Sequence, residues 1–189
     1  HIIETHLHAD HVSGNTDLAA RTGATIYVHE AARAEFAHSP LKDGDVLRLG
    51  NVEIEVRHTP GHTPESVSLL VSDTTRSTEP WLALTGDTLF VGDVGRPDLV
   101  GADAARDLAG DLYDSLFEGL LKLEDGVLIY PGHGAGSLCG RSIGSMRSTT
   151  IGFERGSNPA LTGREKDAFV EFMTQELPEQ PGNHKRIKS

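Results

Sequence analysis

Apolar positions along the chain fall into short runs that are typical of strands, separated by polar loops. The runs "SVSLLVS" (66–72), "WLALTG" (81–86) and "GVLIY" (126–130) predict strands buried on both faces. Polar and apolar residues alternate in "DVLRLGNVEIEV", on both sides of Gly50-Asn51, which predicts a β-hairpin. Shorter runs at 1–3 and 24–29 predict two further strands.

Helical spacing appears between these strands. Every fourth residue in one part of 103–123 is a leucine, which predicts a helix with one face against a core: Leu108, Leu112, Leu116 and Leu120. Residues 15–23 predict a shorter helix, with Asn15 or Thr16 as its N-cap and Gly23 as its end. The alternation of strands and helices predicts an α/β chain.

The last helix is predicted from its start signal. Thr162 and Glu165 have the spacing of a capping box, and the helix that follows is expected to end at Pro178. With 189 residues the chain is long enough for one domain, so 1–189 is expected to form a single domain. Because the sequence opens without Met and apparently inside a strand, we expect the N-terminal part of that domain to be missing.

Composition and charge narrow the class of protein. A formal net charge of -11 disfavours a nucleic-acid partner, and the short "HKRIK" run is expected to be a solvated tail. No apolar run approaches the roughly 20 residues that span a bilayer, so no membrane partner is expected. The single cysteine, Cys139, excludes an intramolecular disulfide and favours a reducing, cytoplasmic location.

Candidate metal ligands lie in four loops that each follow a predicted strand: "THLHADH", "TPGHTPES", "TGDTLFVGDVGRPD" and "YPGHGAGSLCG". Imidazole and carboxylate groups are metal ligands, and functional residues of layered α/β folds gather on loops at strand ends. Singly, each candidate has an ordinary explanation as a cap, a turn residue or a solvated histidine. Together they predict a metal site formed from His6, His8, Asp10, His11, His62, Asp87 and His133.

These motifs, in this order, resemble the metallo-β-lactamase fold superfamily along the whole chain. Within it, "THLHADH", "TGDTLFVGDVGRPDL" and "YPGHGAGSLCG" look most like the bacterial persulfide dioxygenases in which rhodanese domains follow. The resemblance implies a four-layer αββα sandwich, with further strands before His1. Residues 162–189 would then be a C-terminal helix and tail that lead toward a rhodanese domain absent from this chain.

The resemblance also implies a particular site. His6, His62 and Asp87 would hold one Fe(II), a two-His, one-carboxylate set that leaves positions open for substrate and O2. A surrounding group would orient these ligands or, in a two-metal site, hold a second ion: His8, Asp10, His11 and His133. Arg96 and Asp98 match a family pair, and we expect a salt bridge that fixes their loop, with Arg96 assisting catalysis by binding substrate.

The implied reaction converts glutathione persulfide, O2 and water into glutathione and sulfite. The expected partners are therefore these small molecules, with a rhodanese domain or protein, or a second copy of the chain, as further partners. Two alternatives stay open: a dinuclear zinc thioester hydrolase of the glyoxalase II type, with one or two Zn(II), and a docking or regulatory domain of a sulfurtransferase. Cys139 is interpreted as a bystander, and Glu65 as a departure from a small residue that could alter the pocket rim.

Overall fold

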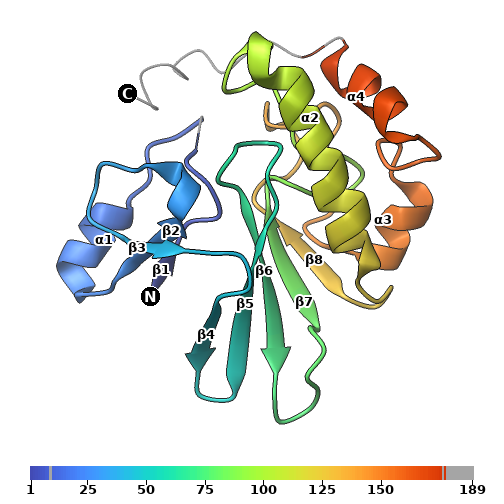
Figure 1. The fold of residues 1–189 in the computed structure, drawn as a ribbon. Helices are drawn as coiled ribbons and strands as arrows, with labels where there is room; N and C mark the ends of the chain where they lie inside the picture. Colours follow the sequence, from blue (N-terminus) through green and yellow to red (C-terminus); the bar gives the residue numbers. More distant parts are fainter. Residues whose placement is uncertain (9, 176, 178–189) are drawn as a thin grey trace.

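The computed structural model describes residues 1–8, 10–175 and 177, and its strands form two sheets (Figure 1). The smaller sheet has the order β1-β2-β3 and is parallel: β1 (Ile2–Ile3), β2 (Ile26–His29) and β3 (Ser39–Leu41). The larger sheet has the order β4 to β9 and is mixed: β4 (Val46–Leu49), β5 (Val52–His58), β6 (Val67–Asp73), β7 (Leu82–Gly86), β8 (Leu128–Pro131) and β9 (Thr149–Thr150).

Helices cover the outer faces of both sheets. The helix α1 (Asn15–Thr22) lies beside the smaller sheet, and the other three lie on the far side of the larger sheet (Figure 1): α2 (Ala105–Asp114), α3 (Ile151–Ser157) and α4 (Lys166–Thr174). Short 3₁₀ or π turns complete the described elements: η1 (Glu30–Ala32), η2 (Ala102–Ala104), η3 (Ser115–Gly119) and η4 (Leu120–Lys122). The chain therefore has the predicted αββα order of layers.

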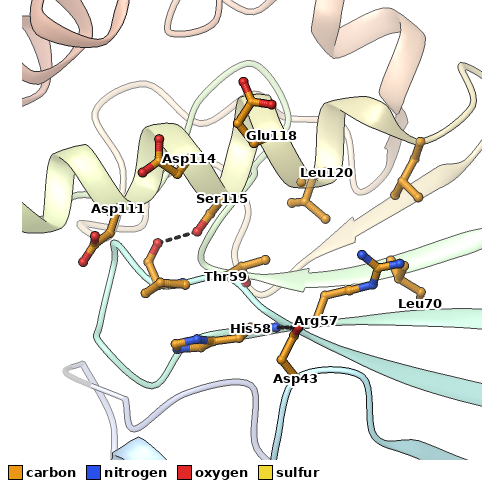
Figure 2. A pocket seen from close by; sticks show the side chains of 13 residues that line it. Asp43, Arg57, His58, Thr59, Leu70, Asp111, Asp114, Ser115, Glu118 and Leu120 are labelled. Carbon is orange, nitrogen blue, oxygen red and sulfur yellow. Dashed lines mark hydrogen bonds between the residues drawn. The ribbon is translucent and has the colours of Figure 1, made fainter.

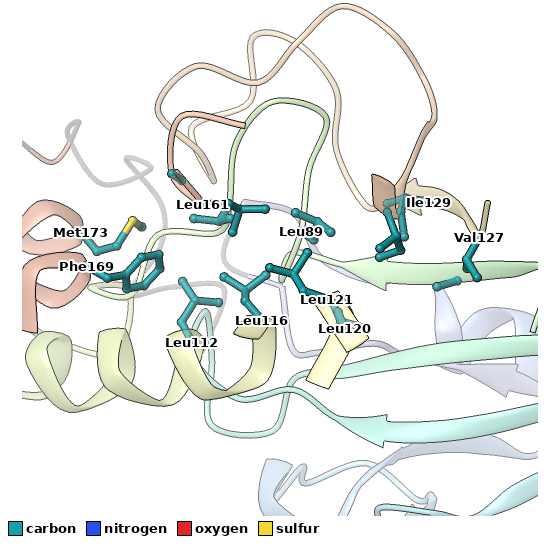
Figure 3. Packing of buried hydrophobic residues seen from close by; sticks show 14 of the residues in the cluster. Leu89, Leu112, Leu116, Leu120, Leu121, Val127, Ile129, Leu161, Phe169 and Met173 are labelled. Atoms are coloured by element: carbon teal, nitrogen blue, oxygen red, sulfur yellow. The ribbon is translucent and has the colours of Figure 1, made fainter. Parts of the chain in front are cut away.

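The alternation of side chains along β6 separates two cores, because successive residues of a strand face opposite sides of the sheet. Val67 and Leu69 face the smaller sheet and pack with Leu41 and Val56. Leu70 faces the helices and belongs to the larger core, which the leucines of α2, η3 and η4 fill together with Phe169 and Met173 of α4 (Figure 3). The expected leucine stripe is thus buried, with Leu108, Leu112, Leu116 and Leu120 at most 5% exposed.

Most predicted elements are present, and three short ones were missed. The hairpin through Gly50-Asn51 joins β4 to β5, and the three apolar runs become β6, β7 and β8. The elements β3, β9 and α3 were not predicted; they span two to seven residues, too few for a hydrophobic period to show.

Two predicted caps are wrong. The helix α1 begins at Asn15 itself, after Gly14, so neither Asn15 nor Thr16 caps it, although Gly23 does end it in a left-handed conformation. Before α4, Glu165 is the N-cap without a side-chain cap bond, because the Thr162 hydroxyl donates instead to the carbonyl of Asn158. The helix ends at Thr174, and the expected stop at Pro178 lies outside the described residues.

Strand direction decides where the candidate ligands meet. The strand β6 is antiparallel to both β5 and β7, and β8 is parallel to β7, so β5, β7 and β8 all point the same way. Their carboxyl ends therefore lie along one edge of the sheet, and the loops carrying His62, Asp87 and His133 leave from that edge. Within the described residues, no helix is long and apolar enough to cross a membrane.

Candidate metal centre

Three predicted ligands meet in the interior at this edge. His6, His62 and Asp87 are at most 2% exposed, and one ligand atom from each lies within 4.8 Å of the others. The Asp87 Oδ2 atom is 3.3 Å from His62 Nε2 and 3.7 Å from His6 Nε2. Ligand atoms about 2.1 Å from one ion are separated by roughly 3.0 Å at a right angle and about 3.4 Å at the tetrahedral angle. These side chains are therefore spaced as the ligands of a single ion.

The Asp87 carboxylate provides a test of whether a metal fits here. Both of its oxygens are buried, and neither makes a hydrogen bond of acceptable geometry to another described residue. A buried carboxylate without hydrogen bonds is costly unless a positive charge compensates it. A divalent cation between Asp87 and the two imidazoles supplies that charge, so the donor set and its surroundings fit a metal ion.

The electrostatics of His6 and Asp87 favour the protonation states that bind metal. Burial, together with the charges of the neighbouring histidines, holds the pKa of His6 well below its usual value, against the opposing effect of Asp87. Burial by itself would raise the pKa of Asp87, but His133, His62 and His6 together lower it below its usual range. Neutral imidazole and ionised carboxylate are the forms that coordinate a metal.

The ring of His62 is oriented from behind by the loop that follows Asp87. Its Nδ1 atom donates to the carbonyl oxygen of Arg96 at 3.0 Å, which leaves the Nε2 lone pair toward Asp87. A ligating histidine commonly donates its second ring N–H in this way, and the bond sets both the tautomer and the ring plane. His62 is thus prepared as an Nε2 ligand.

Arg96 and Asp98 form the predicted ion pair, and it is buried rather than at the surface. The Arg96 Nε and Nη2 atoms donate to the two oxygens of Asp98 at 2.7 and 2.8 Å. Arg96 is 1% and Asp98 7% exposed, and Nη1 donates to the Leu138 carbonyl at 3.1 Å. Because the guanidinium is buried and engaged in this way, the geometry favours holding the loop over direct contact with substrate.

Three of the surrounding candidates, His8, Asp10 and His11, form a separate group, in which one ligand atom from each also lies within 4.8 Å of the others. His8 Nε2 lies 3.3 Å from Glu4 Oε2, a buried carboxylate that sequence reasoning did not single out. His11 Nδ1 lies 3.0 Å from Asp10 Oδ1, and both side chains are exposed to solvent. The two-residue spacing predicts that His8 points the same way as His6, and the two rings do lie together, with centroids 4.5 Å apart. The spacing of Glu4 and His8, four residues apart, was a sign in the sequence that His8 pairs with a nearby carboxylate.

His133 lies on the other side of Asp87. Its Nε2 atom is 3.3 Å from Asp87 Oδ2 and 3.6 Å from Asp10 Oδ2, so it is the one surrounding histidine close to the central carboxylate. The Asp87 carboxylate, with a smaller contribution from Cys139, raises the pKa of His133 to about 10. Cys139 is 1% exposed and offers its sulfur to the same cluster, Asp10, His133 and Cys139. Its interpretation as a bystander to the reaction stays a prediction.

A buried aspartate that was not singled out joins the loops of Asp87 and His133. The Asp93 Oδ2 atom accepts hydrogen bonds from the backbone N–H groups of Arg141 and Ser142, both at 2.6 Å. The side chain of Asn158 donates to the Asp93 carbonyl at 3.1 Å and also contacts the fully buried Glu154. Backbone groups carry most of this network, and a sequence gives no sign of such contacts.

A cavity of about 840 Å³ is lined by His6 of the central group and by His8 and His11 of the surrounding group. Its outer wall includes the segment 31–36 and Val100, and Glu65 also lines it. A second cavity, of about 420 Å³, lies between the end of β5 and the α2–η3 segment (Figure 2). There Ser115 donates to the Pro60 carbonyl at 2.7 Å, close to the His62 loop, but the lining includes none of the candidate ligands. Of these two cavities, the larger is the one that reaches the central group, through His6.

Comparison with curated proteins finds relatives that match most of this chain. An uncharacterised protein of Mycobacterium leprae is 35% identical over 187 residues, which are 86% of this chain and 76% of that protein. The human mitochondrial persulfide dioxygenase is 31% identical over 171 residues, 90% of this chain and 59% of that protein. A hydroxyacylglutathione hydrolase of Polaromonas is 38% identical over 136 residues, 70% of this chain and 47% of that protein. The chain thus spans only about half to three-fifths of the two named enzymes.

Two solved structures also match nearly the whole of this chain. A metallo-β-lactamase structure from Staphylococcus aureus matches with a TM-score of 0.90 and 34% identity, over 98% of this chain and 56% of that one. The structure of ETHE1 from Myxococcus xanthus matches with a TM-score of 0.81 and 32% identity, over 98% of this chain and 72% of that one. The family model of the metallo-β-lactamase superfamily matches residues 1–133. With the fold and the ligand motifs in agreement, this chain belongs to the metallo-β-lactamase superfamily, where its relatives include the persulfide dioxygenases.

Proposed function

We propose that this chain is the catalytic domain of a non-haem Fe(II) persulfide dioxygenase. The proposed reaction oxidises glutathione persulfide, or a related low-molecular-weight persulfide, with O2 to sulfite and the free thiol. One observation carries the proposal: His6, His62 and Asp87 converge in the interior, while His8 pairs with Glu4 and His11 with Asp10. Two histidines and one carboxylate are the ligand set of non-haem iron oxygenases. The similarity to the human and Myxococcus proteins supports the same activity.

In this proposal the residues of the chain have separate tasks. His6, His62 and Asp87 would hold one Fe(II), which when bound supplies open coordination positions and redox chemistry for O2. The Arg96 carbonyl and the Arg96–Asp98 pair keep His62 in its binding orientation. His133 lies beside Asp87, with its Nε2 atom 3.3 Å from Asp87 Oδ2, and would help to hold that carboxylate in place.

The cavity beside His6 and His8 is where substrate would enter. Its volume of about 840 Å³ lies within the range of small-molecule sites, and its lining combines apolar residues such as Phe36 and Val100 with the polar groups of the ligand loop. A tripeptide persulfide would place its sulfur at the inner end and its peptide portion along the segment 31–36. This arrangement brings the reacting groups together, and positioning then accounts for much of the catalysis.

A dinuclear zinc thioester hydrolase is the second candidate, and a specific observation favours it. His133 Nε2 lies within 3.6 Å of both Asp87 and Asp10, so Asp10, His133 and the nearby His11 could supply ligands for a second ion. The similarity to the Polaromonas hydrolase points the same way. Against this, His11 and Asp10 are exposed, and in the described residues they pair with each other. A docking domain of a sulfurtransferase is a weaker alternative. Such a domain would not need an intact ligand set, and this chain has one.

Partners and location follow from the same proposal. The small-molecule partners are the persulfide and O2, and a rhodanese domain or protein would consume or supply sulfur next to this reaction. A second copy of the chain, in a homodimer, is a further proposed partner. We propose no nucleic-acid or membrane partner. The single, buried Cys139 suits a reducing compartment, so we propose a cytoplasmic location, although the human relative is named as mitochondrial.

Oxygen uptake tests the proposed function directly. Protein loaded anaerobically with Fe(II), in a chain extended to the full length of its relatives, should consume O2 when glutathione persulfide is added and should release sulfite. It should hydrolyse S-lactoylglutathione at a negligible rate. The matched control is His62→Ala, which loses a metal ligand and should show neither reaction. Rapid thioester hydrolysis without O2 uptake would replace the dioxygenase by the zinc hydrolase.

A further inference from the structure

We infer that Glu65 is a positioning residue of the metal centre, which holds the backbone between His6 and His8 against the loop that carries His62. The inference rests on the metal site of the proposed function, but it holds for an iron or a zinc ion. Glu65 had been interpreted as a change at the pocket rim. The structure gives it a defined contact, because the backbone N–H of Leu7 donates to Glu65 Oε1 at 3.0 Å.

The contact joins two ligand loops that are far apart in the sequence. Leu7 lies next to the ligand His6, and Glu65 follows the ligand His62 by three residues. A second bond ties the same two segments together, since the backbone N–H of Val67 donates to the Thr5 carbonyl at 2.8 Å. Two bonds at neighbouring positions fix both the separation and the rotation of the segments, and hence the distance between the two imidazoles.

In the part of the chain that the structure describes, the Leu7 N–H donates to a side chain and not to the backbone of a strand. The strand β1 ends at Ile3, so the N–H of Leu7 lies beyond the ladder with β2. A backbone N–H away from bulk water needs a partner. Rotation of the peptide at Leu7 would redirect both His6 and His8, because they lie on either side of it. The acceptor at position 65 therefore controls which histidine faces Asp87.

Glu65 is itself held rigidly. Its residue is 5% exposed, and the turn that carries it is closed by the side chain of Ser66. The Ser66 hydroxyl oxygen accepts from the Thr63 N–H at 3.2 Å and lies 2.8 Å from the Thr63 hydroxyl oxygen. A carboxylate that is already buried in this turn orders the Leu7 peptide without losing side-chain freedom when the metal binds. Residues that support metal ligands commonly act in this way.

The carboxylate has two properties, an acceptor oxygen and a negative charge, and two variants separate them. Glu65→Gln keeps an acceptor for the Leu7 N–H and removes the charge. Glu65→Met keeps a chain of similar length and removes both. The metal affinity of each folded variant is measured with Zn(II) and Co(II) by competition with a chromogenic chelator. The visible spectrum of the Co(II) form reports the ligand geometry independently of activity. The matched control is Glu53→Met, at a partly exposed position of β5.

The inference expects Glu65→Gln to stay within about threefold of wild type and Glu65→Met to lose about 10–100-fold in metal affinity, the usual effect of removing support from a ligand. The Co(II) spectrum should change only in the methionine variant. If Glu65→Met does not fold, Glu65→Asp carries the same test, since it keeps the charge but withdraws the oxygen by one methylene group. It should then show the loss of affinity expected for methionine.

Two results would overturn the inference while leaving the proposed function intact. In one, Glu65→Met, or Glu65→Asp in its place, binds metal with the affinity and spectrum of the wild type. In the other, Glu65→Gln loses as much affinity as Glu65→Met, which would make the charge, and not the contact with Leu7, the property that matters. A wild-type protein that binds neither metal would overturn the proposed function and this inference together.

Discussion

The Nδ1 atom of His62 lies 3.0 Å from the backbone carbonyl oxygen of Arg96, whose side chain forms a buried ion pair with Asp98. One residue therefore orients a proposed metal ligand through its backbone and anchors its own loop through its side chain. A change at Asp98, which pairs with Arg96, should reach the metal through this connection.

Asp98→Asn should destabilise the protein and weaken metal binding together. Removing one partner of a buried ion pair costs about 3–5 kcal/mol, because the other charge stays buried. The loss is measured by urea unfolding of the metal-free protein. The matched control is Glu53→Gln, which disrupts the exposed pair of Arg48 and Glu53 and should cost about 0–1 kcal/mol. Equal costs at the two positions would show that burial of the Arg96–Asp98 pair has no energetic consequence.

Metal content separates a one-metal from a two-metal site. Wild-type protein purified without added metal should contain about one iron per chain and little zinc. His62→Ala should abolish metal retention, since it removes one of three protein ligands. His11→Ala and His133→Ala should keep about one metal per chain, with losses of about 10–100-fold in affinity or activity. Two tightly held ions in the wild type that fall to one in both variants would establish the dinuclear site instead.

Gly132 should be needed for the position of Asp87. A Cβ atom on this glycine would lie 2.6 Å from Asp87 Oδ1, closer than carbon and oxygen approach without a shift. Gly132→Ala should therefore displace the carboxylate and lower metal affinity at least tenfold, a loss of about 1.4 kcal/mol. Gly134→Ala is the control two residues on, because a Cβ there meets nothing within 4 Å. Chelator competition compares the two, and unchanged affinity in Gly132→Ala would contradict the close packing.

Cys139→Ser tests whether the buried thiol takes part in the reaction. The proposed chemistry uses the sulfur of the substrate, so we expect most of the oxygen uptake to remain, within about tenfold of wild type. Some loss of stability is expected, because Cys139 packs with Phe90 and Ile143 and a hydroxyl is less suited to that cluster. Rates of O2 uptake and sulfite release are compared in folded protein. A loss of about a hundredfold would show that the thiol next to His133 does take part.

His29 should contribute to the pH dependence of stability. Burial, together with the charge of His58, lowers the pKa of His29 below its usual value, and the two rings stack with centroids 4.0 Å apart. The unfolded chain then binds the proton more readily, so the contribution of His29 is complete above pH 6.5 and is lost as the pH falls toward its folded value. Its Nδ1 atom accepts from the Ala31 N–H at 3.3 Å, a bond that asparagine could replace.

The measurement compares urea unfolding at pH 7.5 and pH 5.5 for the wild type and His29→Asn. The variant should lose less stability between the two pH values, since one titrating group has been removed while all others are shared. Its absolute stability is a separate matter, because the ring stacking with His58 is also lost. Identical pH slopes would exclude a lowered pKa at His29.

Local patterns already contained much of the fold. The sequence predicts β6, β7 and β8 from their apolar runs and the α2–η4 segment from its spaced leucines. It can do so because burial on one or two faces imposes a period on the sequence. The hairpin at Gly50-Asn51 is likewise local. The helix caps at Asn15 and Thr162 were wrong because a cap depends on which backbone groups are nearby, and the Thr162 hydroxyl reached Asn158 instead.

Candidate ligands were also readable from the sequence, since histidines and aspartates after strands stand out as residue types. Their division into a central and a surrounding group came there only through resemblance to a family. In the structure, strand direction brings the ligand loops together, since β5, β7 and β8 end at the edge where His62, Asp87 and His133 lie. The division within these loops follows from side-chain contacts and from bonds across long sequence separations, such as that of Leu7 with Glu65. Hydrogen bonds to backbone groups leave no trace in residue identity, so only the tertiary structure could show that His6 faces Asp87 while His8 faces Glu4.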